Sequence, residues 1–274
     1  PGSIEAGLKV SELCMGGLGN VNLNYSSFSK NIIWNISVFS SHPVVACLAS
    51  QYAGWNLKHE KFFSLGSGPA RALAQREDIF KELNYTDQGK KTAIILEVNS
   101  QPPEEIIKKI FNDCKVDPTC LYIFLTPTTS IVGNIQVCSR VLEVGLHKAH
   151  TIGFPINKII HGYASTPLPP LSKDTLNGMG RTNDSIIYGG IVDLTVEMSD
   201  AEILENVKKI PSQSAIDYGA PFKTILKKYD GDFYKIDPSL FSPSQVKISS
   251  IITGNSFFAG NTNKELVQKS FFDD

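Results

Sequence analysis

The middle of the chain, residues 91–211, alternates regularly between two patterns of hydrophobic and polar positions. Short apolar runs recur there, as expected of buried strands. Between them apolar residues return every three to four positions, as expected of helices with one buried face. The patterns predict strands at 92–98, 121–126, 156–164 and 191–198, and helices at 102–114, 132–150, 173–188 and 199–210. This alternation predicts a sheet that is covered by helices.

The two ends of the chain are less regular. The N-terminal part predicts a helix or strand at 5–14, a strand at 31–39, a helix at 43–53, and a strand at 61–65 that runs into a helix beginning at Pro69. After residue 211 the sequence predicts one helix at 221–228, a hairpin of 245–253 and 256–261 that turns at Gly254-Asn255, and a C-terminal helix. We therefore predict an α+β fold with α/β-type layers and two domains with mixed sheets. The first domain joins residues 1–90 to 212–274, and the second is 91–211.

One predicted helix carries a cluster of reactive side chains. It lies between a proline pair and paired glycines, with Ser172 as the expected N-cap. Helical spacing puts four polar residues within about a 100° arc: Arg181, Asp184, Ser185 and Tyr188. The opposite side is largely apolar, so this polar face is expected to stay open. It fits a solvated ion pair at i,i+3 spacing, and it also fits a catalytic face; the helix alone does not decide between them.

Two strand-to-helix junctions are candidate anion sites. The first contains Ser67, Gly68 and Arg71, where unpaired backbone N–H groups at a helix start and an arginine could hold a phosphate or carboxylate. A well-capped turn that needs glycine for its geometry explains the same residues about as well. The second junction supplies three hydroxyls, from Thr128, Thr129 and Ser130. Helix capping accounts for one of them.

Composition and motifs exclude several functions. The net charge of −1 shows no basic excess for binding nucleic acid or a membrane surface, and no apolar run is long enough to span a bilayer. Five cysteines without a CxxC pair favour a reducing compartment over disulfides or structural zinc. His147 and His150 lack the partners of a metal site. No phosphate-binding P-loop or dinucleotide fingerprint is present. Cys47 with His42 leaves a thiol hydrolase as a weak alternative.

At a series of blocks the sequence resembles the N5,N10-methenyltetrahydromethanopterin cyclohydrolase family. The blocks run in the family's order through nearly the whole chain: PGSIEAG, LCMGGLG, HPVVACLASQYAGW, FFSLGSGPARALA, LTPTTSIVGNIQV, TPLPP, MGRTNDSIIYGG, DYGAPF and DFYKIDPSLFSP. Their combination is far more specific than any single motif. Family members carry further residues before the first block, so the chain resembles one that lacks the family's N-terminal segment.

The resemblance implies a cytoplasmic enzyme of one-carbon metabolism, as in methanogenesis or methylotrophy. It implies that water adds reversibly to the cationic methenyl carbon of a tetrahydromethanopterin, with no metal and no bound cofactor. It also implies a ligand cleft between two domains and a homotrimer. The alternative is a non-catalytic pterin- or nucleotide-binding protein with the same fold.

The resemblance further implies roles for the candidate residues. Family members place an arginine and an acidic residue three positions later beside the methenyl carbon, and this spacing maps onto Arg181 and Asp184. Arg181 is expected to lower the pKa of Asp184 and to orient the attacking water. The junction at Ser67–Arg71 is expected to hold the substrate's phosphorylated tail. Ser185 and Tyr188, with the three hydroxyls at 128–130, complete the expected substrate-binding set.

Overall fold

Two β-sheets organise the fold, which we describe from a computed structural model at residues 2–26 and 33–273. The larger sheet has the strand order β1-β2-β7-β8-β9-β10. Its neighbours run antiparallel except β8 and β9, which are parallel. The strands are β1 (Asn20–Ser26), β2 (Ile33–Ser40), β7 (Ile159–Pro167), β8 (Ile191–Val196), β9 (Gln245–Ser250) and β10 (Ser256–Gly260). The sheet thus combines strands from both ends and the middle of the chain.

The smaller sheet is continuous in the sequence. Its order is β3-β4-β5-β6, with β3 (Trp55–His59), β4 (Phe62–Ser67), β5 (Thr92–Leu96) and β6 (Leu121–Leu125). The last two strands are parallel and are linked through α4 (Glu104–Cys114). The carboxyl ends of β5 and β6 therefore meet at one edge of this sheet.

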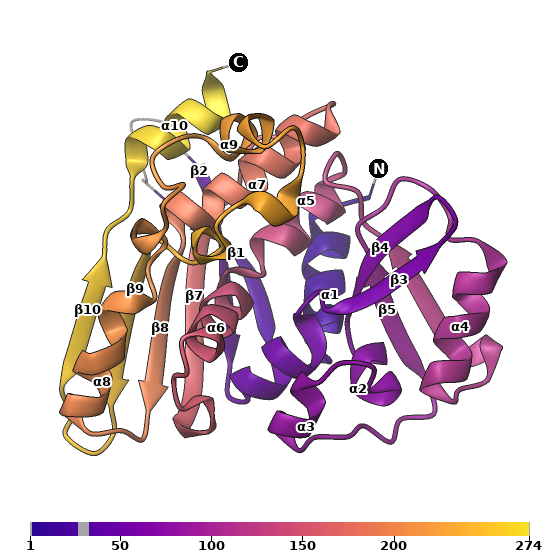
Figure 1. Cartoon of the computed structure of the whole chain (residues 1–274), viewed down its shortest axis with the longest axis horizontal. Helices are drawn as coiled ribbons and strands as arrows, with labels where there is room; N and C mark the ends of the chain where they lie inside the picture. Colours follow the sequence, from indigo (N-terminus) through magenta and orange to yellow (C-terminus); the bar gives the residue numbers. More distant parts are fainter. Residues whose placement is uncertain (1, 27–32, 274) are drawn as a thin grey trace.

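Helices cover the sheets and fill the space between them (Figure 1). The helices of the first half are α1 (Ile4–Cys14), the π-helix η1 (Val44–Gln51), α2 (Ala70–Ala74) and α3 (Ile79–Leu83). The second half adds α5 (Ile131–Cys138), α6 (Val141–Thr151), α7 (Thr175–Gly189), α8 (Asp200–Asn206), α9 (Phe222–Lys228) and α10 (Lys264–Phe272). Short 3-10 turns complete the chain: η2 (Pro118–Cys120), η3 (Ile156–Lys158), η4 (Val207–Lys209), η5 (Ser212–Ser214), η6 (Phe233–Lys235) and η7 (Pro238–Leu240).

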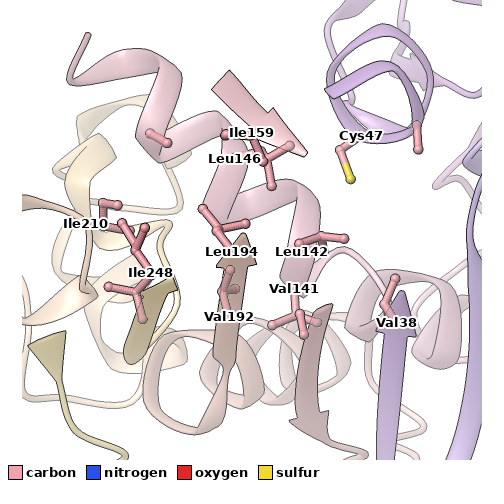
Figure 2. Packing of buried hydrophobic residues seen from close by; sticks show 14 of the residues in the cluster. Val38, Cys47, Val141, Leu142, Leu146, Ile159, Val192, Leu194, Ile210 and Ile248 are labelled. Atoms are coloured by element: carbon pink, nitrogen blue, oxygen red, sulfur yellow. The ribbon is translucent and has the colours of Figure 1, made fainter. Parts of the chain in front are cut away.

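The main core lies between the larger sheet and α6. Figure 2 shows Leu142 and Leu146 of α6 gathered in one cluster with Val192 and Leu194 of β8, all of them buried. A second core packs Ile94 and other residues of the smaller sheet against α4. A third core joins α7 to α9 and α10. Packing of this kind stabilises the fold by about 25 cal/mol for each Å² of apolar surface removed from water.

The predicted α+β class, with mixed sheets and covering helices, is confirmed. The N-terminal segment at 5–14 is a helix, and the strand predicted at 31–39 is found from Ile33 on, its first two residues lying outside the described part. Strands β1 and β3 were not predicted. The turn between β9 and β10 is longer than the predicted two residues.

Two predicted helices differ from the structure in ways that matter for the site. The segment expected as an ordinary helix at 43–53 is the π-helix η1, a form that occurs frequently at functional sites. The long helix expected at 132–150 is broken after Cys138 into α5 and α6. The Ser139 hydroxyl donates back to the carbonyl of Gln136, so it competes with the helical backbone at the break.

Strand pairing does not follow the predicted domain boundaries. A boundary at residue 90 separates β4 from β5, although these strands pair within the smaller sheet. A boundary at residue 211 separates β8 from β9, which pair within the larger sheet. Each predicted boundary therefore cuts through a sheet. The irregular termini misled the prediction, because strands from both termini pair with strands of the regular middle.

Candidate active site

Helix α7 carries the predicted Arg181–Tyr188 face, but it is buried on nearly all sides. Asp184, Ser185 and Tyr188 are each fully buried. Ile187 lies on the apolar face, the one face that the sequence predicts to be buried, and it is buried as well. The prediction of an open polar face is therefore wrong. The helix is enclosed because α5, α9, α10 and β7 all pack against it. Its N-cap is Asp174 rather than Ser172.

Both carboxylate oxygens of Asp184 accept hydrogen bonds from other parts of the chain. Oδ1 accepts from the backbone N–H of Phe222 at 2.8 Å, at the start of α9. Oδ2 accepts from the hydroxyl of Ser270 at 2.6 Å, on α10. Burial raises the pKa of Asp184 to about 7, although these two hydrogen bonds oppose the rise. The carboxylate thus ties α7 to α9 and α10.

The expected electrostatic role of Arg181 is also wrong. The pKa of Asp184 is raised rather than lowered, and the groups that favour its charged form are Ser270 and the Phe222 N–H. The Arg181 guanidinium donates to the carbonyls of Ser270, Pro170 and Leu171 at 3.3–3.4 Å. These contacts hold the segment before α7 and the C-terminal helix together.

Ser185 and Tyr188 are likewise bonded within the protein. The Ser185 hydroxyl contacts Thr166 Oγ1 at 2.8 Å and donates to the carbonyl of Pro167. The Tyr188 hydroxyl donates to the carbonyl of Ala220 at 2.6 Å and accepts from a backbone N–H. Both side chains therefore connect α7 to its neighbours, and the structure does not present them to a ligand.

Arg71 is buried and does not offer a charge to an anion. Its guanidinium forms a bidentate pair with Glu77 at 2.6 and 2.8 Å. It also donates to the carbonyls of Leu48 and Ser50 at the end of η1, at 3.0 and 3.1 Å. The structure therefore does not support Arg71 as a ligand of the substrate's tail, because four of its five N–H groups already donate to protein acceptors. In addition, α2 has only five residues and provides little helix dipole.

The other residues of this junction are also used internally. The Ser67 hydroxyl accepts from Arg140 at 2.7 Å and donates to the carbonyl of Ile95. Gly68 has a φ of +102° that favours glycine, and its N–H donates to Ser50. The turn is a structural joint between β4 and η1.

At the second junction, capping explains one hydroxyl, as expected. Ser130 is the N-cap of α5 and accepts from the Gly133 N–H at 2.9 Å. Thr129 is half-buried. Thr128 is buried, and its hydroxyl has no hydrogen-bond partner among the described residues. Helix α7 packs against this junction, since a Cβ added at Gly178 would lie 3.1 Å from the Thr128 carbonyl oxygen.

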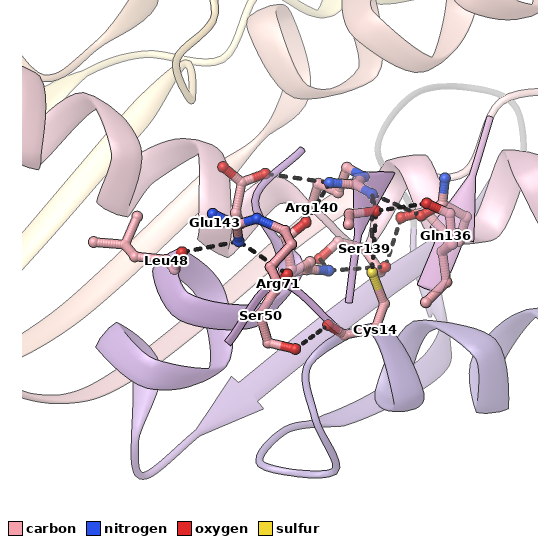
Figure 3. Close-up of polar contacts among 11 residues, drawn as sticks. Cys14, Leu48, Ser50, Arg71, Gln136, Ser139, Arg140 and Glu143 are labelled. Carbon is pink, nitrogen blue, oxygen red and sulfur yellow. Dashed lines mark hydrogen bonds and ion pairs between the residues drawn. The ribbon is translucent and has the colours of Figure 1, made fainter. Parts of the chain in front are cut away.

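A polar cluster that the sequence did not predict lies at the break between α5 and α6, where the two sheets approach each other. Arg140 is its centre (Figure 3). One nitrogen of its guanidinium, Nη1, donates to the carbonyl of Gln51 at 2.6 Å, at the end of η1. The other, Nη2, donates to Ser67 at 2.7 Å and to Gln136 Oε1 at 3.2 Å. The arginine therefore connects β4 of the smaller sheet to the helices that cover the larger one.

Glu143 is the acidic partner of Arg140 in this cluster. The two side chains form an ion pair of 3.7 Å and are only 12% and 6% exposed. Burial raises the pKa of Glu143 to about 7, although the charges of Arg140 and Arg71 lower it. Within the described parts of the chain, the carboxylate has no hydrogen bond or ion pair other than this one. Glu143 therefore has more acceptor capacity left for a ligand or water than Asp184, whose two oxygens each accept a hydrogen bond from the protein.

The sequence did contain one signal for this pair. Arg140 and Glu143 have the same spacing as Arg181 and Asp184, an arginine followed three residues later by an acid. They fall inside the segment 132–150, for which the hydrophobic pattern predicts one continuous helix, and that pattern does not show the break at Ser139. Spacing alone finds both pairs, and only tertiary contacts separate them.

The thiol alternative is not supported by the structure. Cys47 is fully buried in the main core, and burial raises the pKa of its thiol well above the ordinary value. A thiolate nucleophile needs a lowered pKa and access to substrate. Cys47 is therefore a core residue.

Within residues 2–26 and 33–273, no group of three or more histidine, cysteine or acidic side chains is arranged to hold a metal ion. No helix in that part of the chain is long and apolar enough to cross a membrane. One cavity, lined by Arg76, Lys90 and Lys115 with neighbouring residues, lies away from the polar cluster around Arg140.

Comparison with known proteins gives consistent results. A family model described as Cyclohydrolase (MCH) matches residues 1–271. A methenyltetrahydromethanopterin cyclohydrolase of Methylobacillus flagellatus is 49% identical over 98% of this chain and 83% of its own length. The same name is carried by a protein of Methylosinus trichosporium, 48% identical over 94% of this chain and 100% of the relative. An archaeal relative, from Methanococcoides burtonii, is 38% identical over 98% of this chain and 85% of its own length.

Proposed function

Because the chain belongs to the methenyltetrahydromethanopterin cyclohydrolase family, we propose that Glu143 and Arg140 carry the acid–base step of that family's reaction. The enzyme adds water reversibly to the methenyl carbon of methenyltetrahydromethanopterin and yields the formyl compound. The observation that supports this choice of residues is the buried Glu143 carboxylate, which has a raised pKa and unused acceptor capacity.

The chemistry follows from the charge of the substrate. The methenyl carbon belongs to a cationic amidinium, so a carboxylate beside it stabilises the bound cation. The oxygen of water forms a bond to this carbon, and one of its protons passes to Glu143. The proton then returns to one ring nitrogen as the carbon–nitrogen bond breaks. Loss of the remaining hydroxyl proton leaves the neutral formyl group, so one proton is released overall.

Arg140 positions the carboxylate rather than neutralising it. It is fixed by Ser67, Gln136 and the Gln51 carbonyl, and its contact with Glu143 is a longer 3.7 Å. The pKa of Glu143 stays near 7 in spite of this charge because burial dominates. A carboxyl group with this pKa can accept and return a proton near neutral pH.

Asp184 supports this chemistry less well. A base must reach the water that it deprotonates, and both oxygens of Asp184 already accept hydrogen bonds inside the α7–α9–α10 core. Its assignment as the base stays a prediction from sequence spacing. The geometry favours Glu143 instead.

Turnover tests the function directly. The purified protein should bleach the methenyl absorbance of methenyltetrahydromethanopterin, and the product should regain that absorbance on acidification because one proton is consumed in the reverse direction. Dialysis against EDTA should leave kcat unchanged, since we propose that the enzyme works without a metal or a bound cofactor. A protein that binds the substrate but never bleaches it would be a non-catalytic pterin-binding protein.

The cellular setting and assembly are also part of the proposal. We infer a cytoplasmic homotrimer that serves one-carbon metabolism, from the family resemblance and from relatives in bacteria and archaea. We do not infer a role in methanogenesis itself, because relatives named methenyltetrahydromethanopterin cyclohydrolase occur in Methylobacillus and Methylosinus. Sedimentation equilibrium should give three times the 30.0 kDa chain mass. A monomer at micromolar concentration would refute the trimer.

A further inference from the structure

Glu97 is a second carboxylate near Arg140, and it takes no part in the proposed acid–base step. It follows β5 directly, at the edge where the carboxyl ends of β5 and β6 meet. Open α/β sheets bind ligands at this edge. No hydrogen bond or ion pair of the Glu97 side chain is found among the described residues.

Strand alternation sets the direction of the Glu97 side chain. The hydrogen bonds between β5 and its neighbour continue to the end of β5, because the Leu96 carbonyl accepts from the Thr126 N–H at 2.9 Å. Alternation then places Glu97 on the same face as Ile95. Ile95 packs on that face with Cys14 of α1, and its partner in the neighbouring strand is Ser67. The carboxylate therefore extends toward the side of the sheet where Arg140 bonds to Ser67.

Glu97 combines solvent access with loss of hydration. The residue is exposed, yet protein around its carboxyl group raises its pKa to about 7, while the charge of Arg140 lowers it. A group on an open surface would keep its hydration and its ordinary pKa. Protein therefore packs around the carboxyl group, while part of the residue stays open to solvent.

Gln136 provides an independent sign that a ligand binds here. It is 1% exposed, and its Oε1 accepts from Arg140 at 3.2 Å. Its Nε2 has no hydrogen-bond partner among the described residues. A buried donor without a partner destabilises the folded protein, because it loses its hydration without gaining a hydrogen bond. An arriving acceptor would remove that cost.

We propose that Glu97 and Gln136 bind the pyrimidine edge of the pterin ring, and so select a 2-amino-4-oxo heterocycle. This edge presents two parallel donors, the 2-amino group and N3–H, followed by the O4 acceptor. A carboxylate accepts two parallel N–H bonds, and the Gln136 amide donates to O4. The inference rests on the proposed function for the identity of the substrate. It assigns these two residues to binding, and Glu143 to the chemical step.

The test compares pterin with lumazine, which carries an oxygen in place of the 2-amino group, as competitive inhibitors of turnover. The wild-type enzyme should prefer pterin by at least about tenfold, the effect of one charge-assisted hydrogen bond. Glu97→Gln should reduce this preference to below about threefold. It should raise KM for methenyltetrahydromethanopterin at least about tenfold with kcat nearly unchanged, the signature of lost binding. Glu205→Gln, an exposed change on α8, is the matched control and should behave as wild type.

Fluorescence titration with pterin and lumazine gives the same comparison without turnover. If the wild-type protein failed to turn over the substrate, the proposed function would fail, and the titration would still decide the role of Glu97. An unchanged pterin preference and KM in Glu97→Gln, with normal wild-type turnover, would overturn the inference alone.

Discussion

At the scale of single residues, two acids of similar pKa have different surroundings. Glu143 and Asp184 are both buried, and burial raises the pKa of each to about 7. Each oxygen of Asp184 accepts a hydrogen bond, one from α9 and one from α10, whereas Glu143 has only its long ion pair with Arg140 among the described residues. A raised pKa marks a functional site only if the group can also reach a substrate.

The pH dependence of the rate follows from Glu143. The base must be deprotonated, so kcat/KM should rise with pH through about 7 and then level off. In the complex, the cationic substrate favours the charged carboxylate and lowers its pKa. The rise of kcat with pH should therefore lie at lower pH than the rise of kcat/KM. Initial rates between pH 5 and 9 measure both limbs, and a rate that falls as pH rises through 7 would contradict Glu143 as the base.

The pH dependence of stability isolates Asp184. Its pKa is about 7 in the folded protein and near its ordinary value, 3.8, in the unfolded chain, so between pH 4 and 7 the folded state binds more protons. This group therefore adds stability below pH 4, and that contribution is lost as pH rises to 7. Asp184→Asn cannot titrate. Urea unfolding should show that the stability of wild type relative to this variant declines from pH 4 to 7; a constant difference would mean that the folded pKa is not raised.

At the scale of elements, the break between α5 and α6 and the π-helix η1 form one assembly. The last carbonyls of η1 accept from two arginines, Leu48 and Ser50 from Arg71 and Gln51 from Arg140. The guanidinium carbon of Arg71 lies over the ring of Tyr52, just after η1, at 5.1 Å from the ring centroid. Arg71 thus supports the loop to which Arg140 is bonded, and acts through it rather than on the substrate.

Arg71→Met tests this supporting role. It leaves the Glu77 carboxylate without its partner and should destabilise the protein by about 3–5 kcal/mol, as expected for a broken buried pair. Because the Arg71 charge lowers the pKa of Glu143, the kcat/KM limb of any folded variant should move to higher pH.

The matched control is Arg76→Met, which removes a half-exposed arginine paired with Asp113 and should cost less than about 1 kcal/mol. Chemical denaturation of the two variants compares them. Equal losses of stability would show that Arg71 is no more important than a surface arginine.

Local patterns predicted some elements well and missed others for physical reasons. The α4 helix and strands β5 and β6 follow from sequence because their apolar period matches their burial. The π-helix η1 could not be predicted from the sequence, because an apolar run such as VVACLAS fits an ordinary α-helix equally well. Strand β1 was missed because asparagines alternate along it. The break at Ser139 depends on bonds to η1 and β4 that no local pattern records.

At the scale of the whole molecule, the candidate site is a product of long-range contacts. Arg140 bonds to residues 89 and 73 positions earlier in the chain. Asp184 accepts hydrogen bonds from groups 38 and 86 positions later. Sequence identified the reaction through family resemblance, and it supplied the arginine–acid spacing. It could not choose between the two pairs with that spacing, because the choice depends on which carboxylate accepts hydrogen bonds from distant parts of the chain on both of its oxygens.

The most direct test of this account is the turnover of two variants on methenyltetrahydromethanopterin, followed by loss of the methenyl absorbance. Glu143→Gln removes the proposed base and should lower kcat by at least about 100-fold. Asp184→Asn can keep the Phe222 bond through its amide oxygen, and should retain kcat within about threefold of wild type. Circular dichroism would confirm that both variants are folded. Normal turnover in Glu143→Gln together with a collapse in a folded Asp184→Asn would contradict the account and return the catalytic role to α7.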